Sequence, residues 1–87
     1  MDIIYSDEAK KDLEFWTKYG SESEKKKIKT LLLSMKVSPF EGIGKPERLK
    51  YDLSGKWSRR INRKDRIVYR VTDCIEVLSF RGHYDDK

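Results

Sequence analysis

Residues 56–70 read KWSRRINRKDRIVYR, with seven basic side chains and a single acid, Asp65. Apolar residues are interleaved with these charges: Trp57, Ile61, Ile67, Val68 and Tyr69. A solvated, disordered tail carries few such residues, whereas half-buried strands are rich in them. The pattern therefore predicts a basic β-hairpin.

The hairpin register decides which residues lie together, because strand side chains alternate between the two faces of a sheet. We predict a three-residue loop at 62–64, with Ile61 opposite Asp65. The set expected to cover the core is then Trp57, Arg59, Ile61, Ile67, Tyr69 and Val71. The set expected on the other face, called the open face below, is Ser58, Arg60, Arg66, Val68 and Arg70. A two-residue turn at 63–64 would instead mix Arg60 with Ile67, a poorer amphipathic surface.

The chain has 87 residues, of which 37% are hydrophobic and 40% charged. This length predicts one domain over residues 1–87 with a small core, because a chain of this size buries only about 60–65% of its unfolded surface. The single cysteine, Cys74, lies in an apolar run, which favours a buried thiol over a nucleophile. A reducing compartment fits this composition.

The net charge of +5 is concentrated in one segment. Residues 45–70 carry ten basic and three acidic side chains, whereas residues 1–44 carry eight of each. A localised basic excess is typical of a surface that binds nucleic acid, and a solvated basic face is the alternative. No apolar run approaches the roughly 20 residues of a membrane span, and residues 1–5 lack a secretory signal. We therefore expect a cytoplasmic protein without membrane contact.

Helix signals occupy the first half of the chain. After a short strand at 1–5, Ser6 caps a predicted helix over residues 7–19, which Gly20 ends. Residues 21–24, Ser-Glu-Ser-Glu, form a capping box for a second helix that extends to Val37. Its buried residues are expected to be Ile28, Leu31, Leu32 and Met35. The short connection predicts an antiparallel helix hairpin.

Strands are predicted in the second half, at 48–53, in the hairpin and at 74–81. The loop before them contains Gly42 and Gly44, but no strand precedes these glycines and no Gly-Lys-Ser follows, which excludes a dinucleotide or P-loop signature. The order of elements is an N-terminal strand, a two-helix hairpin and three or four antiparallel strands. It predicts an α+β domain with its helices on one face of the sheet.

The chemistry available to the chain is limited. One histidine, His83, and one cysteine argue against a metal site and against a Ser-His-Asp arrangement. RNA cleavage by its own 2′-hydroxyl needs only a base, cations around the phosphate and a proton donor. Glu47 in its basic loop, Arg60 and Arg66 on the open face, and His83 with Tyr84 are residues of these kinds. By themselves they indicate a nucleic-acid binder and leave ribonuclease activity open.

Several ordered motifs match one known family. They are PFEG at 39–42, GKPERLK at 44–50, LSGKWSRRI at 53–61, DRIVY at 65–69 and HY at 83–84. In their order and spacing the chain resembles the YoeB (Txe/YoeB) toxins of bacterial type II toxin–antitoxin systems, within the RelE superfamily, over nearly its whole length. The resemblance implies a microbial ribonuclease-like fold and a bacterial, cytoplasmic protein.

The resemblance also implies a function. Members are ribosome-dependent endoribonucleases, or mRNA interferases, that cut mRNA in the ribosomal A site and stop translation without a metal or cofactor. Carried over by position, Glu47 matches the general base, Arg66 the phosphate-stabilising arginine, His83 the general acid candidate and Tyr84 the terminal active-site tyrosine.

Further basic residues match positions that line the same site, namely Lys50 and Arg60. Arg60 and Arg66 share the open face in the predicted register, whereas Arg59 points the other way. We therefore expect Arg59→Ala to cost less activity than Arg66→Ala.

The implied partners are the ribosome with its mRNA, a second copy of the chain, and a YefM-like antitoxin whose C-terminal segment folds onto the toxin. Operator DNA is contacted only through the toxin–antitoxin complex. Two alternatives stay open, a non-catalytic module that binds nucleic acid through the basic sheet and a ribosome blocker that does not cut.

Two departures from the family pattern bear on the site. Arg48 stands where a proline is common and places a charge beside the candidate base. Residues 85–87 extend beyond the His-Tyr pair at which many members end, and they add two acids. Strand alternation sends His83 and Tyr84 to opposite faces, so Gly82 is expected to supply the bend that lets both reach the site.

Overall fold

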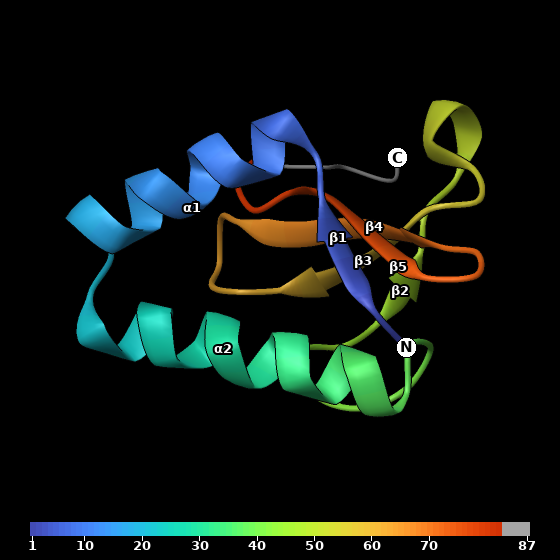
Figure 1. The fold of residues 1–87 in the computed structure, drawn as a ribbon, viewed down its shortest axis with the longest axis horizontal. Helices are drawn as coiled ribbons and strands as arrows, with labels where there is room; N and C mark the ends of the chain where they lie inside the picture. Colours follow the sequence, from blue (N-terminus) through green and yellow to red (C-terminus); the bar gives the residue numbers. More distant parts are fainter. Residues whose placement is uncertain (83–87) are drawn as a thin grey trace.

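The computed structural model describes residues 1–82, and its elements follow the predicted order (Figure 1). The helices are α1 (Asp7–Tyr19), α2 (Glu22–Val37) and a short 3-10 helix, η1 (Tyr51–Leu53). The strands are β1 (Ile3–Tyr5), β2 (Glu47–Arg48), β3 (Trp57–Arg60), β4 (Arg66–Val71) and β5 (Ile75–Ser79). The α+β architecture is confirmed.

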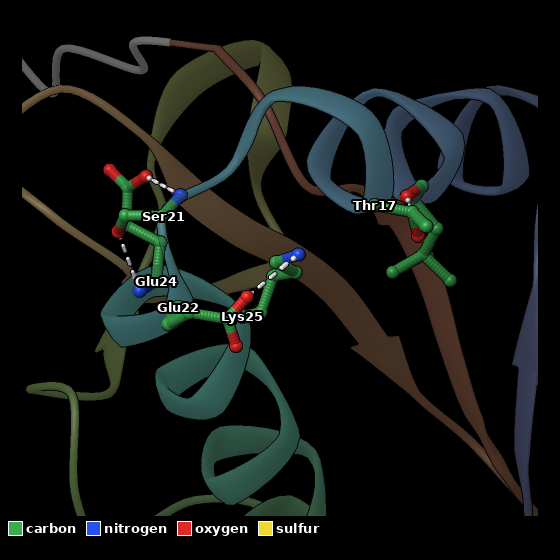
Figure 2. A network of polar contacts seen from close by, with 6 residues as sticks. Thr17, Ser21, Glu22, Glu24 and Lys25 are labelled. Atoms are coloured by element: carbon green, nitrogen blue, oxygen red, sulfur yellow. Dashed lines mark hydrogen bonds and ion pairs between the residues drawn. The ribbon is translucent and has the colours of Figure 1, made fainter.

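The helix boundaries are those that the capping signals predict. Ser6 Oγ accepts from the Ala9 amide at 3.0 Å at the start of α1. Ser21 and Glu24 form the reciprocal capping box of α2, with both hydrogen bonds 3.0 Å long (Figure 2). The two helices run in opposite directions along the sheet (Figure 1). The predicted helix hairpin is therefore confirmed.

The sheet contains five strands in the order β1-β5-β4-β3-β2. Strands β2 to β5 pair antiparallel in sequence order, so the higher predicted count of four is correct. β1 joins the same sheet parallel to β5, with Ile3 beside Ile75. Parallel partners need a crossover connection, and the segments between β1 and β5 supply it. The sheet is mixed, a feature that the sequence pattern did not predict.

The β3–β4 hairpin has the predicted register. Trp57 pairs with Tyr69 and Arg60 with Arg66. The Ile61 amide donates to the Asp65 carbonyl at 2.9 Å, which leaves residues 62–64 as the loop. Asn62 closes this loop, since its side-chain oxygen accepts from the amides of residues 64 and 65 at 2.8 and 2.7 Å. The three-residue loop is confirmed.

The core lies between the helices and one face of the sheet. Its buried members are Ala9, Trp16, Ile28, Leu31, Met35, Ile61, Ile67, Tyr69, Ile75, Val77 and Phe80. Leu32, which was expected among them, is only partly buried. Trp16 also donates its indole N–H to the Phe80 carbonyl at 3.0 Å, which ties α1 to the end of β5. Each large apolar side chain buried here contributes about 1.5–3 kcal/mol to folding.

The open face is less exposed than its pattern predicts. Arg60 and Arg70 are exposed and Arg66 is half-buried, but Ser58 and Val68 are 1% and 2% exposed. These two buried residues lie outside the core cluster. On the open face, the buried Ser58 and Val68 are therefore surrounded by the more exposed arginines.

Two strands are shorter than the ranges predicted for them, 48–53 and 74–81. Only Glu47 and Arg48 form β2, because Tyr51 adopts a left-handed φ of 58° and the chain turns into η1. β5 spans Ile75–Ser79 and carries a bulge, since Tyr69 pairs with Val77 while Val68 pairs with Ser79. The extra residue shifts the alternation of β5 by one position, which returns Phe80 to the core.

Cys74 is half-buried, so the prediction of a buried thiol is wrong. It lies in the turn between β4 and β5, where the chain leaves the core.

Candidate functional site

The candidate site lies on the open face, where β2, β3 and β4 run side by side. Glu47 is paired with Ser58, and Ser58 in turn with Val68. Paired residues on neighbouring strands point to the same face of a sheet. Glu47 and Ser58 therefore lie together, and Arg66, at the start of β4, lies diagonally across from them.

Arg66 contacts both neighbours through one nitrogen. Its Nη1 lies 3.3 Å from Glu47 Oε1 and donates to Ser58 Oγ at 3.2 Å. The side chains of Arg66 and Glu47 are 21% and 47% exposed. An ion pair with this access to water is worth only about 0–1 kcal/mol, so a substrate can replace either partner at small cost. The structure thus brings together two of the residues that the sequence singled out.

Arg60 and Lys50 supply further positive charge. Arg60 is directly opposite Arg66 in the β3–β4 ladder, and it is exposed. Like charges at directly opposite positions repel, and an anion bound between them removes that cost. Lys50 is exposed and lies just before η1.

Arg48 does not point toward Glu47. It pairs with Trp57, on the sheet face opposite that of Glu47, and its guanidinium carbon lies 5.4 Å from the centre of the Trp57 ring. Phe40 contacts the same ring with a centroid distance of 4.9 Å. The charge that replaces the common proline is therefore held against an aromatic pair.

His83 and Tyr84 lie outside the described residues. Gly82 is described, and it has a φ of +120°, which side chains rarely allow. The Gly82 amide donates to Asp65 Oδ1 at 3.2 Å, immediately before Arg66. Gly82 thus adopts a backbone conformation suited to a bend and lies next to the start of β4, and the prediction that this bend brings His83 and Tyr84 to the site stays a prediction.

Two residues near the site were missed as functional candidates, Ser58 and Arg59. Ser58 accepts from Arg66, and the only sequence signal was its place in the predicted open-face set. Arg59 points to the core face as predicted and is 0% exposed. An arginine within an otherwise apolar set was the available signal, and the sequence could not indicate its partners.

Arg59 has a tyrosine beside it. Its Nε donates to Tyr69 Oη at 3.1 Å, and Tyr69 Oη donates to the Pro39 carbonyl at 2.7 Å. Burial raises the pKa of the Tyr69 hydroxyl above its ordinary value, while the hydrogen bond from Arg59 and its charge act in the other direction. The hydroxyl therefore keeps its proton and donates at neutral pH.

Neither a metal cluster nor a membrane span is found in residues 1–82. No three His, Cys, Asp or Glu side chains of this part gather in a way that would hold a metal ion. None of the helices described there is both long enough and apolar enough to cross a membrane.

The fold and this face define a small, basic α+β protein of the RelE/YoeB type, with a carboxylate and a guanidinium in contact on the open side of the sheet. A family described as the YoeB-like toxins of bacterial type II toxin–antitoxin systems matches residues 5–84. The chain belongs to this family. Toxin YoeB of Escherichia coli K12 is 44% identical over 88 residues, which cover 97% of this chain and all of the relative.

Solved structures agree with this assignment. The YoeB/ParE toxin from Agrobacterium tumefaciens is 40% identical and superimposes with a TM-score of 0.90 over 97% of this chain and 100% of that one. YoeB from Staphylococcus aureus, 41% identical over 97% of this chain and 98% of its own, was solved as a dimer, with a TM-score of 0.86. It was also solved in a heterotetrameric complex with YefM, with a TM-score of 0.84. The resemblance and the predicted fold are confirmed.

Proposed function

We propose that this toxin is a ribosome-dependent endoribonuclease that cuts mRNA in the ribosomal A site. The observation that carries the proposal is the contact between Glu47 and Arg66 on the open face, with Arg60 opposite Arg66. A base and two cations at one place meet two of the three requirements for self-cleavage of RNA at a 2′-hydroxyl, and the third is a proton donor for the leaving oxygen. Family membership supports the same reading.

The proposed reaction uses the nucleotide's own 2′-oxygen as nucleophile. Glu47 accepts the proton of the 2′-hydroxyl while the oxygen attacks the adjacent phosphorus, and the bond from phosphorus to the 5′-oxygen breaks. Arg66 exchanges its contact with Glu47 for one with a phosphate oxygen, where it stabilises the charge that develops. The products carry a 2′,3′-cyclic phosphate and a 5′-hydroxyl.

Other residues have proposed roles that follow from the family resemblance. His83 is the candidate donor of the proton to the departing 5′-oxygen, and Tyr84 assists at the same site. Lys50 and Arg60 bind the RNA backbone near the scissile phosphate, because both are exposed and positively charged.

The proposed partners follow from the relatives. We expect a YefM-like antitoxin to neutralise this chain and the toxin to form a homodimer, because Staphylococcus aureus YoeB was solved both as a dimer and in complex with YefM. Operator DNA is expected to be bound only by the complex with the antitoxin.

The decisive experiment maps mRNA ends on ribosomes programmed with a defined codon in the A site. Wild type should cut in the A site and leave the products named above. Glu47→Ala and Arg66→Ala should each lower the cleavage rate by about 100-fold or more. Intact A-site mRNA with wild type, or cleavage by the two variants at the wild-type rate, contradicts the proposal.

The same basic face is the basis for the alternative, a module that binds nucleic acid without cutting. Such a module loses affinity about equally with each exposed arginine, its binding falls steeply with salt, and Glu47 is irrelevant to it. A ribosome blocker arrests translation without new mRNA ends. Measuring binding and cleavage on the same Glu47→Ala protein separates these readings, because only the nuclease keeps binding and loses cleavage.

A further inference from the structure

Arg59 is 0% exposed, yet no carboxylate neutralises it among its hydrogen-bond partners in residues 1–82. A guanidinium has five N–H donors, and here each has an acceptor. Nε donates to Tyr69 Oη at 3.1 Å and Nη1 to Ser34 Oγ at 2.8 Å. The remaining three N–H groups donate to main-chain carbonyls of one loop, at Ser38, Glu41 and Ile43, over 2.6 to 3.2 Å.

These bonds fasten the loop over residues 38–44 to β3. A buried positive charge is costly unless it is fully hydrogen-bonded, so the loop carbonyls must point inward to meet it. The loop fits closely around the guanidinium, because a Cβ on Gly42 would lie 2.5 Å from Ser34 Oγ and 3.2 Å from Arg59 Nη1. Gly42 has a φ of +115°, which places its peptide groups in this arrangement.

The fastened loop leads directly into the strand that carries Glu47. The Gly44 carbonyl accepts from the Arg60 amide at 2.7 Å, which continues the attachment to β3. Lys45 follows with a left-handed φ of 51°, a conformation that lysine adopts only where its surroundings impose it. β2 itself contains only Glu47 and Arg48, too few residues to hold their own place.

We propose that Arg59 is a positioning residue, which places the Glu47 carboxylate beside Arg66 by holding the loop over residues 38–44 against β3. Arg59 is buried on the core face, so it does not touch the substrate and acts only through the loop. The inference rests on the proposed function for its effect on cleavage. Its effect on the structure of β2 can be measured independently of any activity.

The first test measures amide hydrogen exchange in Tyr69→Phe and Ser34→Ala, which remove acceptors of Arg59 but leave the arginine in place. In both variants the amide hydrogens of Leu49 and Arg60 should exchange about tenfold faster than in wild type. The Leu49 amide donates to the Lys56 carbonyl and the Arg60 amide to the Gly44 carbonyl, so both report on how firmly this region is held. The Ser6 amide, which donates to the Val77 carbonyl at 3.0 Å, should be unchanged. Tyr19→Phe, on an exposed ring far from the loop, is the matched control.

The second test is a double-mutant cycle with ribosome-dependent cleavage as its readout. Tyr69→Phe alone should lower kcat by about tenfold with KM unchanged, since misplacing a catalytic group slows chemistry more than binding. In a Glu47→Ala background, Tyr69→Phe should change kcat by less than about twofold, because the Glu47 carboxylate that the loop positions has been removed.

Three results overturn the inference. The first is wild-type exchange at Leu49 and Arg60 in both variants. The second is equal acceleration at Leu49, Arg60 and Ser6, which indicates only a general loss of stability. The third is a full tenfold effect of Tyr69→Phe in the Glu47→Ala protein. If wild type does not cut mRNA, the proposed function fails, and the exchange result still decides whether Arg59 positions β2.

Discussion

Arg66 Nη1 lies 3.3 Å from Glu47 Oε1, so the candidate base and the candidate phosphate ligand are in direct contact. A phosphate that binds Arg66 must compete with this carboxylate. In the proposed reaction, Arg66 gives up this contact when it binds the phosphate, and Glu47 is then free to accept a proton. The contact therefore holds the candidate base and the candidate phosphate ligand side by side on the open face.

Arg66 should not be replaceable by lysine. Arg66→Lys keeps the charge but loses the planar, multi-donor guanidinium with which Arg66 binds Ser58 and, in the proposed reaction, a phosphate oxygen, so we expect cleavage to fall by about 10- to 100-fold. Arg70→Lys is the matched control, because Arg70 lies on the same strand and pairs with Glu76 away from Glu47. Single-turnover cleavage on programmed ribosomes measures both, and equal rates for the two variants would contradict the role of Arg66.

Ser58 should influence catalysis through Arg66. Ser58→Ala removes the hydroxyl that accepts from Arg66 Nη1 at 3.2 Å, which leaves the guanidinium less well oriented. We expect kcat to fall by about 3- to 10-fold, corresponding to the roughly 1 kcal/mol of one hydrogen bond. Ser54→Ala, in the exposed turn before β3, should have wild-type kcat.

Substituting Arg59 should mainly lower stability, whereas substituting Arg66 should mainly lower cleavage activity. Arg59→Ala leaves several buried acceptors without donors, and we expect it to lower the free energy of unfolding by about 3 kcal/mol or more. Arg66→Ala should change it by less than about 1 kcal/mol, because its ion pair is accessible to water. Corrected for the folded fraction, Arg59→Ala should still cut faster than Arg66→Ala. Urea unfolding and cleavage are measured on the same samples of the two variants. Faster corrected cleavage by Arg66→Ala than by Arg59→Ala would contradict this prediction.

The capping box of α2 should contribute measurably to stability. Ser21→Ala removes the hydroxyl that accepts from the Glu24 amide at 3.0 Å (Figure 2), and we expect a loss of about 1 kcal/mol. Ser23→Ala lies on the exposed side of the first turn and should be close to neutral. Urea unfolding of the two variants compares them directly, and equal losses would exclude a specific capping effect.

Stability should fall in acid partly through Glu24. The hydrogen bond from the Ser21 amide, followed by that from Asn62, lowers the pKa of Glu24 below its ordinary value of 4.5. A carboxylate with a lowered folded-state pKa stabilises the protein above its unfolded pKa and loses this effect as the pH falls through the folded value. Wild type should therefore be more stable than Glu24→Gln at pH 7, and the difference should shrink toward pH 3. A difference that is constant with pH would contradict this linkage.

Local patterns in the chain are sufficient to predict the helices and the hairpin. Ser6, the Ser21 capping box and the alternation around residues 62–64 act over a few residues, so their outcome depends little on the remainder of the fold. The short β2 and the bulge in β5 were not predictable in this way. Tyr51 turns the chain through a left-handed φ that a bulky residue rarely adopts, and Phe80 returns to the core because it packs against distant segments.

The candidate site also combines features that were predictable from local patterns with features that depend on the tertiary structure. Alternation alone predicted that Arg60 and Arg66 share a face and that Arg59 does not, because each strand has a period of two residues. Family resemblance singled out Glu47, but its contact with Arg66 depends on the pairing of β2 with β3, which joins residues far apart in the chain.

Near neighbours in the chain are enough to specify the hairpin register and the helix boundaries, and strand alternation specifies the charge of the open face. The pairing of β1 with β5, the hydrogen-bond partners of the buried Arg59, and the path of the loop from Arg59 to Glu47 depend on the tertiary structure. Those features arise from long-range pairing and from the need to satisfy a buried charge, and neither has a period that can be read along the chain.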